Sequence, residues 1–183
     1  MSLCRKKNGL TLRVQGKDGL SSFRSSPGIT LSLNQFLADQ VVIYPFFGLD
    51  SLGITHCRSG RIECNFNKDT SFSMAEGFFS LLNNESCKNL VITFPSGYYE
   101  GISIFIDPKE VSENLPPVLR DIPRNPELWK RPFPLPGRSV VFTAGPDIEN
   151  IFRPLYDLPP DLRMPYFRLK IPGTFSVFMP PFL

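Results

Sequence analysis

The 183-residue sequence contains a single histidine, His56, and this scarcity limits the catalytic sites that the chain can build. A Ser–His–Asp or Cys–His site would have to be organised around His56, and zinc sites usually need several His or Cys ligands. Cys57 follows directly, but neighbouring residues on a strand point to opposite faces. The sequence also lacks the GxGxxG, P-loop and HExxH motifs. We therefore predict that the chain is not an enzyme and has no catalytic residues, no metal site and no cofactor.

Long apolar runs and dense charge are also missing. No window of roughly 18 or more apolar residues could span a bilayer, and no apolar segment follows the charged N-terminus as in a signal peptide. The net charge is only +3, without the basic stripe that neutralises phosphates. The four cysteines show no CxxC spacing, which fits reduced thiols. We expect a soluble, cytoplasmic chain that contacts no membrane and binds no DNA by itself.

Prolines are scarce in the first half of the chain: only Pro27, Pro45 and Pro95 precede Pro108. Strand ladders tolerate few prolines, so we expect the strands before residue 108. Short β-rich runs separated by turn residues recur there, at residues 29–33, 41–46, 52–58, 61–66, 78–82, 90–94 and 101–106. This spacing predicts an antiparallel sandwich or barrel. Residues 1–27 are rich in Gly, Ser and Lys, and we expect them to form a flexible arm.

The dipeptide Ser59–Gly60 is predicted to form a compact hairpin turn, because glycine supplies the positive φ that such turns need. After it, apolar Ile62, Cys64 and Phe66 alternate with polar Arg61, Glu63 and Asn65. Before it, Ile54, His56 and Arg58 alternate with Thr55 and Cys57. One face of the hairpin is therefore apolar and the other carries ionisable groups. The pattern leaves open whether those groups are solvated or line a cavity.

The C-terminal third is predicted to be largely helical. An amphipathic turn is expected at residues 108–115, then a proline-rich connection and a strand at 139–144. Asp147 is expected to cap a helix through Tyr156, whose apolar residues recur at helical spacing. The pair Pro159–Pro160 breaks it, and a second helix runs from Asp161 toward Ile171, where Pro172–Gly173 is a stop signal.

Six residues are candidates for ligand binding: Tyr44, His56, Arg61, Glu63, Tyr98 and Glu100. His56 is interpreted either as a hydrogen-bonded barrel residue or as a ligand contact. Glu63 and Glu100 could act as paired carboxylates only if the fold brought them together, and an Arg61–Glu63 ion pair is the simpler reading. The tyrosines could form amphipathic pocket walls or pack at a rim.

Three segments resemble one branch of the AraC-type transcription regulators. Residues 56–63, HCRSGRIE, resemble its "hCxxGRxE" signature, and residues 94–107, FPSGYYEGISIFID, resemble "FPxxxYxGIxIxID". Residues 147–170 resemble its helical tail, "iExIFxxLYxxPxxxRxxYFrLK". The similarity covers residues 27–170. It implies a mainly β fold: an antiparallel, cupin-like (jelly-roll) barrel over residues 28–145, followed by two C-terminal helices over residues 146–171.

The resemblance also implies a function. Such barrels sense a small molecule and often help dimerisation, and a pair of helix-turn-helix units follows them. We therefore expect an effector-binding and dimerisation domain, with an unidentified small-molecule effector and a homodimer, truncated before its DNA-binding domain. The alternative is a small cupin-type enzyme, such as a metal-dependent isomerase or oxygenase. Cupin enzymes hold their metal through several histidines, whereas His56 has no companion and Glu100 stands where the second motif would want His.

The last residues depart from the family pattern, which continues as a Leu-rich helix. Residues 172–183 form an apolar tail without charge. Deleting one base from suitable codons for this stretch yields the reading ILELFQFL, which matches that helix. We therefore hypothesise that residues 172–183 are out of frame; the alternatives are a truncated domain and a natural stand-alone one.

Overall fold

The computed structural model describes residues 2–6, 9–13, 19–43, 51–67, 70–84, 90–114, 125–136 and 138–178. Its strands are β1 (Ser2–Lys6), β2 (Gly9–Arg13), β3 (Gly19–Ser26), β4 (Ile29–Phe36), β5 (Gln40–Ile43), β6 (Leu52–Asn67), β7 (Thr70–Ala75), β8 (Phe78–Asn83), β9 (Leu90–Thr93), β10 (Tyr99–Ile106) and β11 (Ser139–Thr143). Its helices are α1 (Pro108–Glu113), α2 (Pro126–Lys130), α3 (Pro146–Asp157) and α4 (Pro160–Phe178). None of the described helices is long and apolar enough to cross a bilayer.

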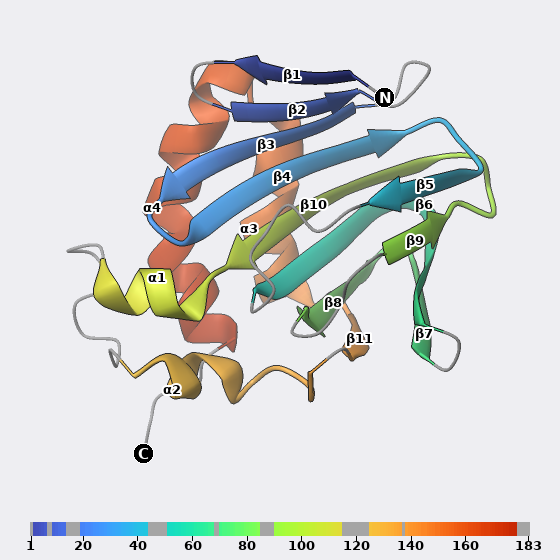
Figure 1. Ribbon diagram of the computed structural model, residues 1–183. Helices are drawn as coiled ribbons and strands as arrows, with labels where there is room; N and C mark the ends of the chain where they lie inside the picture. Colours follow the sequence, from blue (N-terminus) through green and yellow to red (C-terminus); the bar gives the residue numbers. More distant parts are fainter. Residues whose placement is uncertain are drawn as a thin grey trace.

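The strands form two antiparallel sheets that share β6. The first sheet has the order β1-β2-β3-β4-β10-β6-β8-β11, and the second joins β5, β9, β6 and β7. Residues 52–60 of β6 pair with β10 and residues 61–67 pair with β7, so this one long strand passes from the first sheet into the second. Figure 1 shows α3 and α4 against the first sheet, with β5 and β9 on its other side. The predicted mainly β, antiparallel fold with C-terminal helices is confirmed.

The predicted hairpin at Ser59–Gly60 is wrong, because β6 continues through these residues as one strand. Gly60 does have a positive φ of 83°, but this conformation bends a continuous strand at the point where it changes partners. A Cβ at Gly60 would lie 2.2 Å from the carbonyl oxygen of Tyr98, so the close approach of β10 also requires glycine. A two-residue turn instead lies at Pro27–Gly28 and joins β3 to β4.

The flexible arm predicted for residues 1–27 is also corrected. This region contains β1, β2 and β3, and β3 pairs with β4 from Gly19↔Gln35 to Ser26↔Ile29. The periodicity of these residues is weak, but backbone pairing of β1 with β2, of β2 with β3 and of β3 with β4 forms hydrogen bonds whatever the side chains are. Among the other strands, β4, β5, β8, β9, β10 and β11 overlap their predicted runs, whereas β7 was not predicted.

The helices follow the predictions with three differences. Helix α2 lies in the stretch predicted as a proline-rich connection; Asn125 caps it and Pro126 begins it, which is a favourable start. Helix α3 begins after Gly145, so Asp147 lies in its first turn and is not the cap. Helix α4 continues through Pro172 to Phe178, so the predicted stop at Ile171 is wrong. A proline removes one helical hydrogen bond, and the turns on either side keep theirs.

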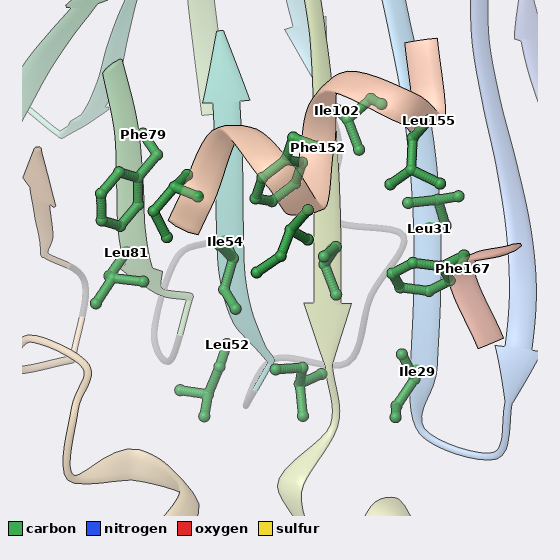
Figure 2. Close-up of a cluster of buried hydrophobic side chains, with 14 of the residues drawn as sticks. Ile29, Leu31, Leu52, Ile54, Phe79, Leu81, Ile102, Phe152, Leu155 and Phe167 are labelled. Atoms are coloured by element: carbon green, nitrogen blue, oxygen red, sulfur yellow. The ribbon is translucent and has the colours of Figure 1, made fainter. Parts of the chain in front are cut away.

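The main hydrophobic core lies between the first sheet and the helices. Figure 2 shows Ile29, Leu31, Leu52, Ile54, Phe79, Leu81 and Ile102 of the strands facing Phe152, Leu155 and Phe167 of α3 and α4. Phe152, Leu155 and Phe167 are fully buried. Burying such side chains stabilises the fold by roughly 1.5–3 kcal/mol each. The helices are therefore firmly packed on this face of the sheet.

A second apolar cluster lies between the two sheets. It contains Phe36, Cys57 and Tyr99 from the first sheet, Ile62, Cys64, Met74 and Ile92 from the second, and Phe94. Ile62 and Cys64 are buried, whereas Arg61 and Asn65 are exposed, which confirms the alternation predicted for this half of β6. This cluster joins the two sheets and leaves another part of the first sheet's inner face to polar residues.

Candidate functional site

Four small hydroxyl side chains cross the inner face of the first sheet in one row. Register places Ser32 opposite Ser103, Ser103 opposite Thr55, and Thr55 opposite Ser80, on β4, β10, β6 and β8. They alternate with the residues that pack under the helices, so they lie on the face turned toward the second sheet. We call Ser32, Thr55, Ser80 and Ser103 the polar row.

The polar row is a hydrogen-bonded network with an open end. The amide of Asn34 donates to Ser103 Oγ at 3.0 Å and its Oδ1 accepts from Ser32 Oγ at 2.9 Å. Thr55 Oγ1 and Ser103 Oγ share a hydrogen bond of 2.9 Å. Ser80 Oγ, by contrast, is buried and has no partner within the described residues. Thr55 is partly buried, whereas Ser32, Ser80 and Ser103 are buried.

Tyr99 supplies a second buried hydroxyl without a described partner. It lies on the same inner face, beside Gly101, where an added Cβ would come within 2.1 Å of the Tyr99 hydroxyl oxygen. Burial raises the pKa of Tyr99 well above its ordinary value, so this hydroxyl keeps its proton. An unpartnered buried hydroxyl costs roughly 1–3 kcal/mol. The inner face therefore presents two neutral groups, Ser80 and Tyr99, that a ligand could satisfy.

His56 points the other way, toward α3. Its Nε2 lies 3.0 Å from Glu149 Oε1 and its Nδ1 lies 3.0 Å from the hydroxyl of Tyr156. The imidazole also stacks on Phe152, with ring centroids 5.0 Å apart and planes 9° apart. Both ring nitrogens are thus occupied by helix residues, and His56 joins β6 to α3 and does not line the space between the sheets.

Burial sets the protonation state of His56. Desolvation lowers its pKa from the ordinary 6.5, although the hydrogen bond and the negative charge of Glu149 act in the opposite direction. A neutral imidazole has one donor and one acceptor. With Nε2–H donating to Glu149, Nδ1 is left as an acceptor and shares the O–H of Tyr156 with the carbonyl oxygen of His56, 3.2 Å from that hydroxyl. This arrangement uses the capacity of the neutral ring completely.

Charged residues from all three resemblance segments meet beside His56. The Arg58 guanidinium lies 2.9 Å from Asp157 Oδ1 and 3.7 Å from Glu100 Oε1. Glu100 Oε2 also accepts a hydrogen bond of 3.2 Å from the Tyr98 hydroxyl. Tyr98 and Glu100, both predicted site residues, therefore lie together. Desolvation raises the pKa of Tyr98, and the charge of Glu100 acts in the same direction.

Next to this group lies a cleft of about 220 Å³ between the sheet and the helices. It is lined by Leu33, Asn34 and Gln35 of β4, Glu100 and Gly101 of β10, Leu155 and Tyr156 of α3, and Arg163 of α4. Arg163 is held in place by the C-terminal end of α3: its Nε donates to the carbonyl of Leu158 at 2.8 Å, and its Nη2 to that of Tyr156 at 3.2 Å.

The remaining predicted site residues lie elsewhere. Arg61 and Glu63 form an ion pair of 3.1 Å, about half exposed, on the outer face of the second sheet, where Arg61 also donates to Ser73. This ion pair is the simpler of the two interpretations given for Glu63 from the sequence. Glu63 and Glu100 are on different sheets and are not brought together as paired carboxylates. Tyr44 lies outside the described residues.

The buried cysteines offer no activated thiol. Burial raises the pKa of Cys57 to about 12, and it raises the pKa of Cys64 as well. A nucleophile needs the thiolate, which both environments disfavour. Among the described residues, no three His, Cys, Asp or Glu side chains gather as metal ligands.

The sequence analysis missed the polar row, Asn34 and the helix partners of His56. For β4 a signal was present, because Ser32 and Asn34 alternate with Leu31 and Leu33 as the two faces of a strand require. The partners Glu149 and Tyr156 are about 100 residues from His56. Their spacing of seven residues puts them on one face of a helix, but no local pattern links them to the strand.

No family model matches the sequence, and no curated protein matches it. Solved structures do resemble part of it. A Cupin 2 conserved barrel domain protein from Salinispora arenicola aligns with a TM-score of 0.43 and 15% identity, over 56% of this chain and 86% of its own. The cupin domain of Cnp3 from Schizosaccharomyces pombe gives 0.41 and 15%, over 56% and 74%.

An HTH_3 family transcriptional regulator from Vibrio cholerae aligns with a TM-score of 0.41 and 12% identity, over 49% of this chain. The match spans 51% of that regulator, so it covers only about half of its length. The solved structures that this chain partly resembles therefore include two cupin domain proteins and one transcriptional regulator.

Proposed function

We propose that the chain is the effector-binding and dimerisation domain of an AraC-type transcription regulator, works in the cytoplasm and has no catalytic activity of its own. Contacts among the three resemblance segments support this. His56 of the first segment contacts Glu149 of the third, and Arg58 contacts both Glu100 of the second and Asp157 of the third. The segments thus form one structural unit that fixes α3 to the barrel.

The effector is a small, uncharged molecule that binds between the two sheets. The observation that carries this proposal is the polar row, with the buried and unpartnered hydroxyls of Ser80 and Tyr99 on the same face. Hydrogen bonds to the ligand would remove the cost of leaving these groups unpartnered. The groups of this row are neutral, so they favour hydroxyl and amide groups over charged ones.

Binding would act on the helices through β6. Thr55 belongs to the polar row, and the next residue, His56, holds α3. A ligand that prefers one arrangement of β6 would therefore shift the population of helix arrangements and, in a homodimer, the contacts between copies. The shift can be no larger than the ligand's difference in affinity for the two arrangements.

The proposal is tested by thermal unfolding in the presence of pentoses, hexoses and polyols, with the matching sugar acids as charged counterparts. A ligand specific for the native state raises the unfolding temperature by mass action. We expect at least one neutral compound to do so and its acid to fail. Light scattering on the same samples measures the dimer.

Two variants locate the binding. Thr55→Val should weaken the stabilising compound by about three- to tenfold, because it removes one hydrogen bond of ordinary strength. Ser73→Ala, on the outer face of the second sheet, is the matched control and should change nothing. If no neutral compound stabilises the protein, the proposal fails. A stoichiometric bound metal that is lost in His56→Ala would favour the cupin-type enzyme instead.

A further inference from the structure

The cleft between the sheet and the start of α4 has the walls of a binding site. Its floor includes Leu33 and Leu155, which are apolar, and it is bounded by Glu100 on β10 and Arg163 on α4. A volume of about 220 Å³ equals roughly seven waters at about 30 Å³ each. A small metabolite fits this space, whereas a nucleotide or a flavin is too large. The cleft opens on the helix side of the first sheet, and Asn34, which lines it, also hydrogen-bonds to Ser32 and Ser103 of the polar row.

Arg163 keeps donors available for a ligand. Two of its N–H groups donate to the carbonyls of Tyr156 and Leu158 at the end of α3. A guanidinium has five N–H groups in a fixed, planar arrangement, so three have no partner among the described residues. The two backbone contacts hold the plane in place and reduce the entropy lost when a carboxylate binds to the free edge.

Glu100 keeps acceptors available. One of its oxygens accepts from the Tyr98 hydroxyl, and Arg58 is 3.7 Å from the other. Arg58 lies nearer to Asp157, at 2.9 Å, so its charge is shared between two carboxylates. A carboxylate offers about four acceptor sites. Glu100 can therefore accept further hydrogen bonds from a charged donor; its side chain is 28% exposed, and the residue lines the cleft.

The two charges select the ligand class. A simple anion would be attracted by Arg163 but repelled by Glu100. A simple cation would be attracted by Glu100 but repelled by Arg163. A molecule with both charges a few atoms apart satisfies both walls at once. We propose that this cleft binds a free amino acid, with its carboxylate on Arg163 and its ammonium group on Glu100. The bound molecule would bridge α4 and β10, two elements that lie on either side of the cleft.

The test is isothermal titration of the full chain with each of the twenty standard amino acids. We expect at least one to bind. For that amino acid, the two analogues that lack the carboxylate or the ammonium group should bind at least tenfold more weakly, as expected for loss of a charge-assisted hydrogen bond. Glu100→Gln and Arg163→Gln should each weaken binding of the amino acid by about tenfold or more.

Two matched variants complete the test. Arg153→Gln removes an exposed charge from α3 outside the cleft and should leave affinity unchanged. Thr55→Val alters the polar row and should also leave the affinity for the amino acid unchanged, so this site and the inter-sheet site can fail separately.

Three outcomes would overturn the proposal. They are that no amino acid binds with a dissociation constant below about 10 mM, that the single-charge analogues bind as tightly as the amino acid, or that Thr55→Val weakens binding and Glu100→Gln does not. Arg163 contacts the end of α3, so the analogue series on the unaltered protein decides the outcome should Arg163→Gln unfold.

Discussion

Lowering the pH should loosen the attachment of α3 through one residue, His56. The pKa of this imidazole is lowered mainly by burial, so the folded protein holds it neutral while the unfolded chain protonates it near 6.5. Below that pH the unfolded state binds more protons than the folded state, and the free energy of unfolding falls. The stability is fully present above pH 6.5 and is lost as the pH falls toward the folded pKa.

The magnitude follows from proton linkage. One proton taken up only on unfolding changes the free energy of unfolding by at most about 1.4 kcal/mol for each pH unit. The side chain of His56 is 3% exposed, so solvent screens this effect little. The sequence has no other histidine. A change in the free energy of unfolding with this slope, between about pH 6.5 and pH 5, is therefore assigned to the titration of His56.

Urea unfolding at several pH values, in the wild type and in His56→Gln, measures the effect. The wild type should lose stability relative to His56→Gln as the pH falls, because glutamine does not titrate. Glu149→Gln should enhance the effect, since Glu149 raises the pKa of His56 through its hydrogen bond and its charge. In that variant the free energy of unfolding should go on falling down to a lower pH than in the wild type. Parallel pH profiles for the wild type and His56→Gln would refute the reasoning, and the NMR titration of the one imidazole checks the pKa directly.

Three further predictions concern packing and thiol reactivity. Phe152→Ala, at a fully buried position, should lower the free energy of unfolding by about 3–5 kcal/mol in urea titrations; a loss below about 1 kcal/mol would mean that α3 packs loosely. Gly101→Ala should cost about 1–3 kcal/mol because its Cβ would meet the hydroxyl and Cζ of Tyr99, and the cost should shrink in a Tyr99→Leu background, which removes both atoms. An equal cost in both backgrounds would contradict this contact. Cys57 and Cys64 should resist a thiol reagent near pH 8 until urea unfolds the chain, because burial raises the pKa of both thiols; fast labelling of these two cysteines in the native protein, located by peptide mapping, would show that they are accessible.

Local patterns in the sequence were enough to predict most strands and both C-terminal helices. Alternation in residues 61–65 and helical spacing from Ile148 to Leu155 both survive in the structure, because each face of these elements has one environment. Gly60 illustrates the limit. Its positive φ was predicted correctly, but a bend within a strand and a turn between strands need the same φ. The choice depends on Tyr98, which comes just before the distant strand β10 and which no local pattern contains.

The candidate site was predicted less well than the fold. His56, Tyr98 and Glu100 do gather near one cleft, but the groups that complete their surroundings come from α3 and α4, far along the chain. The direction in which His56 points depends on how β6 is divided between two sheets. The register of β10 against β6 also shifts between Glu100 and Gly101, where Arg58 of β6 is the extra residue. Such long-range geometry is set by packing and not by residue type.

Three consecutive residues of β6 have three different surroundings. Thr55 belongs to the polar row, His56 is hydrogen-bonded to Glu149 of α3, and Cys57 is buried among the apolar side chains between the two sheets. Because the peptide units between them are planar and the strand is paired on both sides here, the backbone cannot tilt at one of these residues without displacing its neighbours. A displacement of Thr55 from the inner side of the sheet would therefore also displace His56 and its contacts with α3.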